Sequence, residues 1–266
     1  MYFSISLSKI FEMEVIFLGT GTSQGTPILG CDCEVCKSND LHDKRLRSSV
    51  LIHNDGTDIL IDCGPDFRYQ MIREGANNVD AILFTHGHVD HTGGLDDIRP
   101  LNYLTKKPME IYAEQRVIDA LHKQFFYIFD NSTYPGVPKV NIHPIDSDTD
   151  FYVGKTKITP IRAYHGQLPI LGFRIGKFAY ITDAKVVPES EMEKLKYVDT
   201  LVVNALQYDV HPMHFTLDEA VAFAKTVGAR RTYFTHIGHR ISYATAMAKL
   251  PQNMELAYDG LKLILD

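Results

Sequence analysis

The stretch His86-Gly87-His88-Val89-Asp90-His91 comes directly after the apolar run Ala81-Ile82-Leu83-Phe84. Four of its six side chains, three imidazoles and one carboxylate, are of the kinds that bind metal ions. The run is short and lies between Asp80 and Thr85, so it predicts a buried strand whose end carries the histidines into a loop. Imidazole and carboxylate suit divalent ions, with Zn²⁺ first and Mn²⁺ or Ni²⁺ as alternatives. We therefore expect a two-metal hydrolase site.

Composition sets the limits around this site. The chain has 266 residues, 45% hydrophobic and 23% charged, enough for one sizeable core. The first clear strand pattern begins at Met13. We therefore expect an N-terminal extension over residues 1–12 and a single domain over residues 13–266. We expect a cytoplasmic protein, because no apolar run reaches the roughly 20 residues of a membrane helix and Lys9 and Glu12 interrupt any signal-peptide core. The net charge of −6 disfavours long nucleic acid as a partner; a homodimer stays open.

Strand and helix signals alternate along the chain without repeats or linkers. Strands are predicted at 14–19, 50–52, 58–61, 81–84, 109–113, 140–145, 156–163, 172–175, 178–182, 200–203 and 231–235. Helices are predicted at 117–126, 190–195, 217–227 and 243–250. Thr216 and Glu219 have the spacing of a capping box, and Gly228 is suited to end that helix. The pattern indicates an α/β fold in which packed sheets are covered by helices.

Three further ligands are expected where a predicted strand meets a loop, because such loops often carry catalytic groups. His165 follows the strand at 156–163, Asp183 the strand at 178–182, and His236 the strand at 231–235. We predict that one ion is held by His86, His88 and His165, the other by Asp90, His91 and His236, with Asp183 bridging the two. A carboxylate can span ions about 3.5–4 Å apart, and a bridging hydroxide would be the nucleophile.

A second cluster of metal ligands lies in Cys31-Asp32-Cys33-Glu34-Val35-Cys36. Three thiols within six residues indicate a metal site more than a disulfide. A structural Zn²⁺ needs a fourth ligand, and His239, three residues after His236, is our candidate. Redox pairs and free thiols remain alternatives. Cys63 is expected to be a small buried residue.

The seven ligands in this order resemble the metallo-β-lactamase superfamily. The resemblance implies a four-layer αβ/βα sandwich from Met13 onward, beginning at Phe17-Leu18-Gly19-Thr20-Gly21-Thr22. The cysteine loop with its histidine resembles the PhnP-like branch, which hydrolyses small phosphodiesters, some of them cyclic. That resemblance implies one structural zinc on Cys31, Cys33, Cys36 and His239 beside two active-site ions.

The PhnP-like branch also has a histidine that is not a metal ligand, matched here by His214. We therefore take Asp90 and His214 as the candidate catalytic residues, His214 as general acid or as donor to a phosphate oxygen. His211 competes for that role. Asp62 is expected to orient a ligand histidine, or else to form a turn before Gly64. Arg99 could contact a second phosphate, but a salt bridge to a neighbouring aspartate is favoured.

Four other functions are compatible with a metal-binding site of this kind. A tRNase Z-like RNA 3′-processing endonuclease is disfavoured because the segment 202–206 lacks that family's glutamate and no basic arm is visible. A secreted β-lactamase is disfavoured because Asp183 stands where those enzymes use cysteine. A glyoxalase II-like thioester hydrolase shares the ligands but leaves the cysteine loop unexplained. A metal-binding sensor without catalytic activity stays open.

Overall fold

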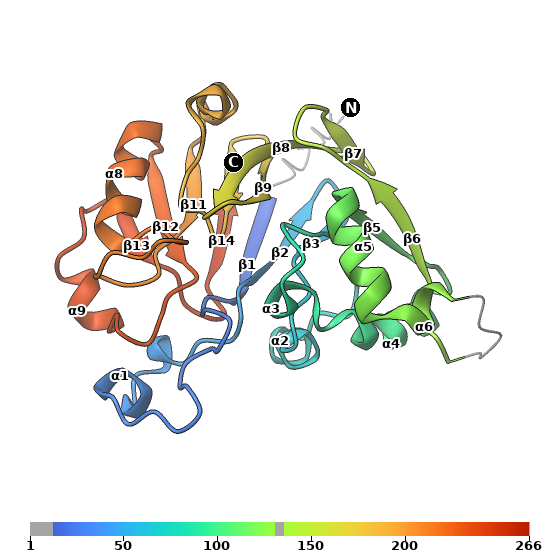
Figure 1. The fold of residues 1–266 in the computed structure, drawn as a ribbon, viewed down its shortest axis with the longest axis horizontal. Helices are drawn as coiled ribbons and strands as arrows, with labels where there is room; N and C mark the ends of the chain where they lie inside the picture. The colour runs from blue at the N-terminus through green and yellow to red at the C-terminus, as the bar shows by residue number, and fades with distance from the viewer. Residues whose placement is uncertain (1–12, 131–135, 266) are drawn as a thin grey trace, which may run out of the picture.

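Two β-sheets face each other, and helices cover their outer surfaces (Figure 1). The computed structural model describes residues 13–130 and 136–265, so the predicted extension over residues 1–12 lies outside the described residues. Each sheet has seven strands, in the orders β14-β1-β2-β3-β4-β5-β6 and β13-β12-β11-β10-β9-β8-β7. The layers are therefore αβ/βα, and the predicted fold class is confirmed.

The first sheet combines an antiparallel half with a parallel half. Its strands are β1 (Met13–Gly19), β2 (Ser49–Asn54), β3 (Thr57–Ile61), β4 (Ala81–Leu83), β5 (Met109–Ala113), β6 (Val140–Pro144) and β14 (Lys262–Leu265). The pairs from β14 to β3 are antiparallel and those from β3 to β6 are parallel. Helices α2 (Phe67–Glu74), α4 (Arg99–Thr105) and α5 (Gln115–Gln124) contribute apolar residues to the core on its outer face. Short helices α1 (Glu34–Lys37), α3 (Val89–Thr92) and α6 (Phe126–Phe129) lie in the connections.

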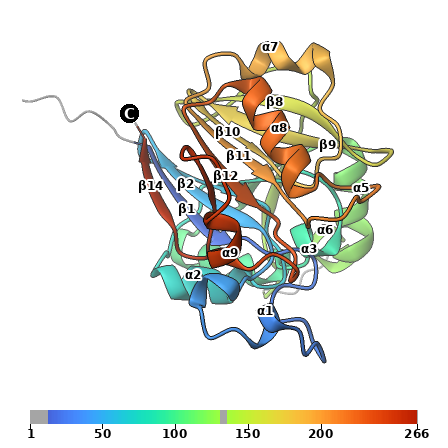
Figure 2. The same ribbon diagram turned by 90° about the vertical axis from the view of Figure 1, so that its left-hand side faces the viewer.

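The second sheet is antiparallel at one end and parallel at the other. Its strands are β7 (Phe151–Val153), β8 (Thr156–His165), β9 (Leu168–Ile175), β10 (Phe178–Ile181), β11 (Thr200–Asn204), β12 (Arg231–Thr235) and β13 (Met254–Leu256). Strands β10 to β13 run parallel. Helices α7 (Met192–Leu195), α8 (Leu217–Val227) and α9 (Tyr243–Met247) belong to its outer core, and Figure 2 shows α8 and α9 over β11 and β12.

Apolar residues alternate between the two faces of each sheet and so fill three separate cores. Phe17, Ile59, Phe173 and Tyr180 pack between the sheets. The outer core of the first sheet includes Leu18 and Leu60, their neighbours in sequence. A sheet with both faces covered reads as a nearly continuous apolar run, which is why these strands are visible in the sequence.

Most predicted elements are present, and the missed ones have weak local patterns. Helix α8 spans the predicted residues, with the Thr216–Glu219 capping box formed and Gly228 in the left-handed conformation. The predicted helix at 117–126 divides into α5 and α6, and those at 190–195 and 243–250 are shorter. Strands β7, β13 and β14 and helices α1, α2, α3 and α4 were not predicted; the three strands have only three or four residues each. No helix of the described part is long and apolar enough to span a bilayer.

Candidate metal centre

The ends of parallel strands bring the predicted ligands to one edge of the sandwich. His86 lies two residues beyond Phe84, just after β4; Asp183 follows β10, and His236 follows β12. Asp183 and His236 have positive φ angles of 57° and 53°. A residue other than glycine rarely adopts this conformation, and such strain concentrates at functional sites.

Helix α3 turns the second half of the motif toward the first. His88 is its N-cap residue, and Asp90 and His91 lie in its single turn. Gly87 is close to α5: a Cβ atom there would lie 3.2 Å from the Cβ of Ala120. This tight approach gives a physical reason for glycine between the two histidines.

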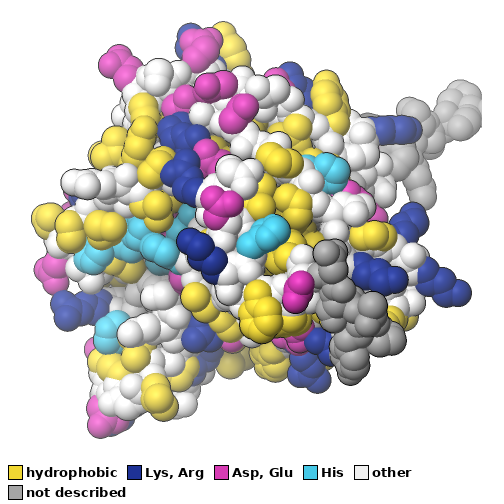
Figure 3. Space-filling model, turned by 45° about the vertical axis from the view of Figure 1, so that its right-hand side comes forward, with side chains coloured by type: hydrophobic (Ala, Val, Ile, Leu, Met, Phe, Trp, Pro, Cys, Tyr) yellow, Lys and Arg dark blue, Asp and Glu magenta, His cyan; other side chains and the backbone are white. Residues whose placement is uncertain are grey.

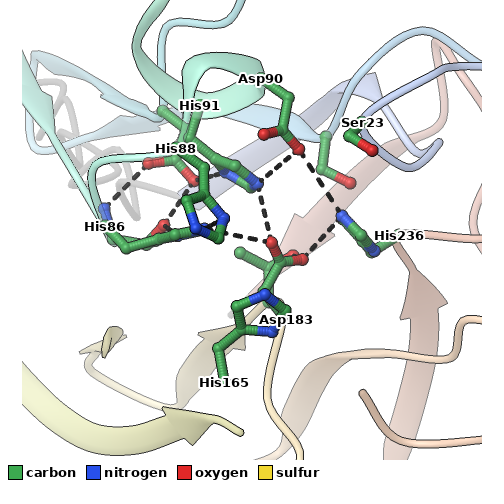
Figure 4. A network of polar contacts seen from close by, with 12 residues as sticks. Ser23, His86, His88, Asp90, His91, His165, Asp183 and His236 are labelled. Atoms are coloured by element: carbon green, nitrogen blue, oxygen red, sulfur yellow. Dashed lines mark hydrogen bonds and ion pairs between the residues drawn. The ribbon is translucent and has the colours of Figure 1, made fainter. Parts of the chain in front are cut away.

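Two groups of ligand atoms result, and Asp183 belongs to both. Within each group the ligand atoms lie within 4.8 Å of one another. The groups are His86, His88 and Asp183, and Asp90, His91, Asp183 and His236. Figure 4 shows these side chains converging, with Ser23 on the Asp90 side.

The Asp183 carboxylate links the two groups through both of its oxygens. Oδ2 lies 3.3 Å from Nε2 of His86 and 3.0 Å from Nε2 of His91. Oδ1 lies 2.7 Å from Nε2 of His236. The carboxylate is therefore placed as the predicted bridge, although the bridging role itself is still a prediction.

His165 approaches the first group but is not one of the atoms in it. Its ring centroid lies 5.2 Å from that of His88 and 5.9 Å from that of His86. Its Nδ1 lies 3.0 Å from the carbonyl oxygen of Met213, which leaves Nε2 for an ion. As a ligand of the first ion, His165 is still a prediction.

Asp62 contacts His91 directly and His86 through Thr85, two of the candidate ligand histidines. Its Oδ2 lies 2.6 Å from Nδ1 of His91 and accepts a hydrogen bond from the Thr85 hydroxyl at 2.8 Å. Oδ1 accepts the Thr85 backbone N–H at 2.9 Å. The Thr85 hydroxyl also lies 3.0 Å from Nδ1 of His86. One buried carboxylate thus orients ligands in both groups, as expected of a residue behind a metal site.

The charge of this cluster fits bound cations. Burial opposes ionisation of Asp183, yet His236 and His91 hold the pKa of its carboxyl well below its usual range. Burial likewise opposes protonation of His236, yet the Asp183 carboxylate raises the pKa of His236 to about 9. Buried carboxylates surrounded by imidazoles demand nearby positive charge, which protons or divalent ions can supply. Both the donor types and the charge therefore suit a pair of divalent ions.

His214 lies beside the two groups without belonging to either. Its ring stacks on His236 with centroids 5.0 Å apart and lies 4.4 Å from the ring of His165. Burial and the neighbouring His236 lower the pKa of His214 to about 3. The ring is therefore neutral in this state and carries one N–H donor. Its rival His211 instead accepts the backbone N–H of Met213 at 3.2 Å.

The cysteine cluster is assembled as predicted. The Sγ atoms of Cys31, Cys33 and Cys36 lie 3.3, 3.4 and 3.7 Å from Nδ1 of His239. The N–H of Cys36 donates to Cys33 Sγ and lowers the pKa of that thiol to about 6, whereas burial raises the pKa of Cys36 to about 11. Cys63 is fully buried elsewhere. Three sulfurs and one imidazole nitrogen suit a tetrahedral zinc site.

Arg99 and Asn204 have structural roles. Arg99 Nη2 donates to both carboxylate oxygens of Asp96, at 2.7 and 2.8 Å, which is the favoured salt bridge. The Asn204 amide was not predicted: it accepts the N–H of Ala184 at 2.7 Å and donates to its carbonyl at 3.0 Å. It therefore holds the turn that carries Asp183. The sequence shows only that Asn204 follows the predicted strand at 200–203; its contact with Ala184 depends on how β10 and β11 pack.

The histidines are partly accessible from outside. His88 is exposed, and His211 and His214 are half-buried. In Figure 3 several histidine side chains lie close together at the left of this face, beside hydrophobic, lysine and arginine side chains, and others stand apart. A substrate can therefore reach this edge of the sandwich from solvent.

Comparison with known proteins identifies the family. Residues 57–237 match the family described as the beta-lactamase superfamily domain. A crystal structure described as a new diphosphatase from the PhnP family is 41% identical, with a TM-score of 0.90, and the match covers 96% of this chain and 97% of that one. Zn²⁺-bound PqqB from Methylobacterium extorquens is 20% identical with a TM-score of 0.78, covering 94% and 99%, and shares the fold.

A longer relative is also similar over nearly the whole chain. The octanoyltransferase of Porphyromonas gingivalis is 41% identical over 257 residues, which are 96% of this chain and 52% of that protein. The chain thus spans about half the length of the curated relatives it matches.

Proposed function

Because this chain belongs to the beta-lactamase superfamily and, within it, to the PhnP family, we propose that this metal-dependent hydrolase cleaves small phosphodiesters, some of them cyclic. The observation that carries the proposal is the shared carboxylate of Asp183, which joins His86 to His91 and His236. A shared carboxylate between two groups of ligands is the arrangement of a two-ion hydrolase.

The residues present would hold two ions and position a substrate between them. His86, His88 and His165 would hold one, and Asp90, His91 and His236 the other. Two divalent ions bound there would polarise the phosphoryl oxygens and supply a nucleophile by lowering the pKa of water to about 7. The identity of the ions, Zn²⁺ or Mn²⁺, and their number are part of the proposal.

Two side chains would act on the substrate itself. Asp90 is only partly buried, with Oδ2 3.2 Å from Nε2 of His91, and would orient the attacking water as well as bind an ion. His214 presents a ring N–H beside His165 and His236. The His214 ring would donate a hydrogen bond to a phosphoryl oxygen. Alternatively, the negative charge of the bound substrate would raise the pKa of His214, which could then protonate the leaving oxygen.

The relatives support phosphorus chemistry and add one alternative. The related protein described as a diphosphatase acts, by that name, on a phosphorus centre. The name octanoyltransferase instead favours an acyl substrate, and a hydrolase with these ligands could cleave an octanoyl thioester. The cysteine cluster and 41% identity to the PhnP-family protein over nearly all of both chains favour the phosphodiester.

The test is a substrate panel on the purified chain loaded with two equivalents of Mn²⁺ or Zn²⁺. Bis(p-nitrophenyl) phosphate, a five-membered cyclic phosphate ester, pyrophosphate and an S-octanoyl thioester would be compared by kcat/KM, with Asp183→Ala as the control. We expect the two phosphodiesters to be turned over fastest and the control to be inactive. Faster cleavage of the thioester would replace the proposal by the acyl alternative. No turnover of any substrate would favour a metal-binding sensor.

We also propose a structural zinc on the cysteine cluster, a cytoplasmic location, and a small substrate in place of long nucleic acid. The formal charge of −6 supports the last point, because a surface that binds long nucleic acid is usually basic. A homodimer stays open, and size-exclusion chromatography with light scattering decides it.

A further inference from the structure

A cavity of about 420 Å³ lies at the end of the sandwich opposite the metal centre. It is lined by Phe178, Thr200 and Arg231, which are the first residues of β10, β11 and β12. The metal ligands Asp183 and His236 follow the other ends of these strands. We call this space the distal cavity. Its size is within the range of small-molecule sites.

Two polar side chains face the space between the sheets at this end. Side chains two residues apart on a strand point to the same face. Val202 and Tyr233 pack in the core between the sheets, so Thr200 and Arg231 point into the same layer, at its open end. Phe178, paired with Thr200 in register, completes this row.

The wall of the distal cavity is partly apolar. Ile175, Phe178 and Leu265 line it and belong to the buried core between the sheets. Met13 also lines it and packs against that core. A ligand that fills the cavity would therefore bury apolar surface as well as meet polar groups.

The lining is basic, and part of this charge has no ionic partner. Lys155, Lys157, Lys177, Arg230 and Arg231 contribute to it, against Asp55 and Asp199. Lys177 pairs with Asp199 at 3.1 Å and Lys157 with Asp150 at 2.6 Å. Within residues 13–130 and 136–265, no carboxylate forms an ion pair with Lys155, Arg230 or Arg231.

Buried polar atoms at the same place lack partners. Thr200 is 1% exposed, and its hydroxyl has no hydrogen-bond partner among the described residues. The same is true of Nε of Arg231, whose guanidinium otherwise contacts Tyr233. Buried polar groups are normally satisfied, so this donor pair leaves two hydrogen-bonding positions for an acceptor beside Thr200 and Arg231.

We propose that the distal cavity binds a small amphipathic anion, with its carboxylate or phosphate head on Arg231 and Thr200 and its short apolar body against Phe178 and Ile175. The free cations attract the head, and the guanidinium can donate to two of its oxygens. This site is separate from the metal centre and does not depend on the proposed phosphodiesterase activity.

The test is calorimetric titration of the full chain with octanoate and, separately, octyl phosphate, two anions that differ only in the head. Inorganic phosphate supplies a head without a body, and octanol a body without a head. We expect one site for an amphipathic anion, with at least about tenfold weaker binding of both partial probes. Arg231→Gln should weaken binding about ten- to a hundredfold, because it removes a charged hydrogen bond.

Three further variants locate the site. Arg230→Gln changes an exposed lining residue, so folding is not at risk, and it should weaken binding several-fold. Arg68→Gln changes an exposed arginine of α2 outside the cavity and should have no effect. Asp183→Ala should leave binding unchanged. Binding that is lost in Asp183→Ala but kept in Arg231→Gln and Arg230→Gln would place the anion at the metal centre, and absence of binding by both amphipathic anions would overturn the proposal.

Discussion

Asp62 and His214 are expected to act on the metal centre in different ways, and single substitutions can separate their roles. Asp62 is fully buried and contacts His91 of one group directly. It reaches His86 of the other group through the Thr85 hydroxyl. His214 is half-buried; its ring stacks on that of His236 and lies at a tilt to that of His165. Asp62 should therefore control metal affinity, and His214 should control the rate of catalysis.

Asp62→Asn is expected to weaken metal binding while the fold is kept. An amide cannot reproduce the charge that fixes the tautomer of His91, and loss of such a partner typically costs about 10–100-fold in metal affinity or activity. Competition with a chromogenic chelator measures the affinity. Asp97→Asn, a change in the same region that touches none of the ligands described, is the control. Unchanged affinity would show that Asp62 serves the turn at Gly64 alone.

His214→Ala is expected to lower kcat about 10²–10⁴-fold for a diester with a poor alkoxide leaving group. The metal content should stay constant, because His214 is in neither group of ligands. With a p-nitrophenyl leaving group, which departs without protonation, the loss should be much smaller.

The pattern of these losses identifies the role of His214. Equal losses on both substrates would assign it to a phosphoryl oxygen, which agrees with the lowered pKa of about 3 and a neutral ring in the free protein. No loss on either would remove it from catalysis. His211→Ala is the matched control.

At the scale of elements, the loop that contains α1 is joined to the loop after β12. His239 completes the cysteine cluster only three residues after His236. The buried Arg45 adds a second connection, because it donates to the carbonyls of Gly238 and Ile241 at 3.2 and 2.9 Å. The N-terminal loop therefore braces the segment that carries a ligand of the metal centre.

Cys36→Ser is expected to release about one equivalent of zinc and lower the thermal midpoint, because binding to a structural site contributes to folding free energy. The ions at the metal centre should be retained, since the cysteine cluster holds none of their predicted ligands. Elemental analysis and thermal unfolding measure both effects. Cys63→Ala, at a buried thiol outside the cluster, should keep its zinc. Equal zinc content in the parent and Cys36→Ser would contradict a structural site.

A cross-strand ion pair makes the β2–β3 hairpin sensitive to pH. His53 and Asp58 are register partners, with Nδ1 and Oδ1 2.5 Å apart. The hydrogen bond raises the pKa of His53 and lowers that of Asp58. The raised pKa contributes stability that is full below about pH 6.5 and is lost as the pH rises through the folded value. The lowered pKa contributes stability above about pH 3.9 that is lost on acidification.

His53→Gln should therefore reduce the free energy of unfolding most between these limits. Both side chains are about a quarter to a third exposed, 34% for His53 and 22% for Asp58, so we expect at most about 1 kcal/mol. Urea unfolding at about pH 5.5 and about pH 8.5 measures the difference, with His122→Gln as the control histidine. A destabilisation that is the same at both pH values would refute the ion-pair explanation.

At the scale of the whole molecule, the site was predictable because its ligands follow strands. The run at 81–84 marks β4, and four ligands follow within seven residues of it. Asp183 stands two residues after the end of β10, and His236 directly follows β12; the apolar runs of both strands are equally clear. Local patterns were sufficient because parallel strands place their ends together.

Features that depend on distant contacts were not visible in the sequence. The pairing of β14 with β1 joins the two ends of the described chain. The role of Asn204 depends on the packing of β11 beside β10, and the positive φ angles of Asp62 and Asp183 on how their strands end. The distal cavity likewise forms only when both sheets are stacked, so no stretch of the sequence predicts it.

The central claim is that Asp183 joins two ions into one catalytic unit. The most direct measurement is a titration of metal-free protein with Mn²⁺, in which bound metal and turnover of bis(p-nitrophenyl) phosphate are followed together. In the parent we expect turnover to rise chiefly between the first and second equivalents bound at the metal centre. Asp183→Ala should fold normally but show no turnover at any metal concentration, because the ions lose their shared ligand. Full turnover with one equivalent, or parental turnover by Asp183→Ala with two ions bound, would contradict the account.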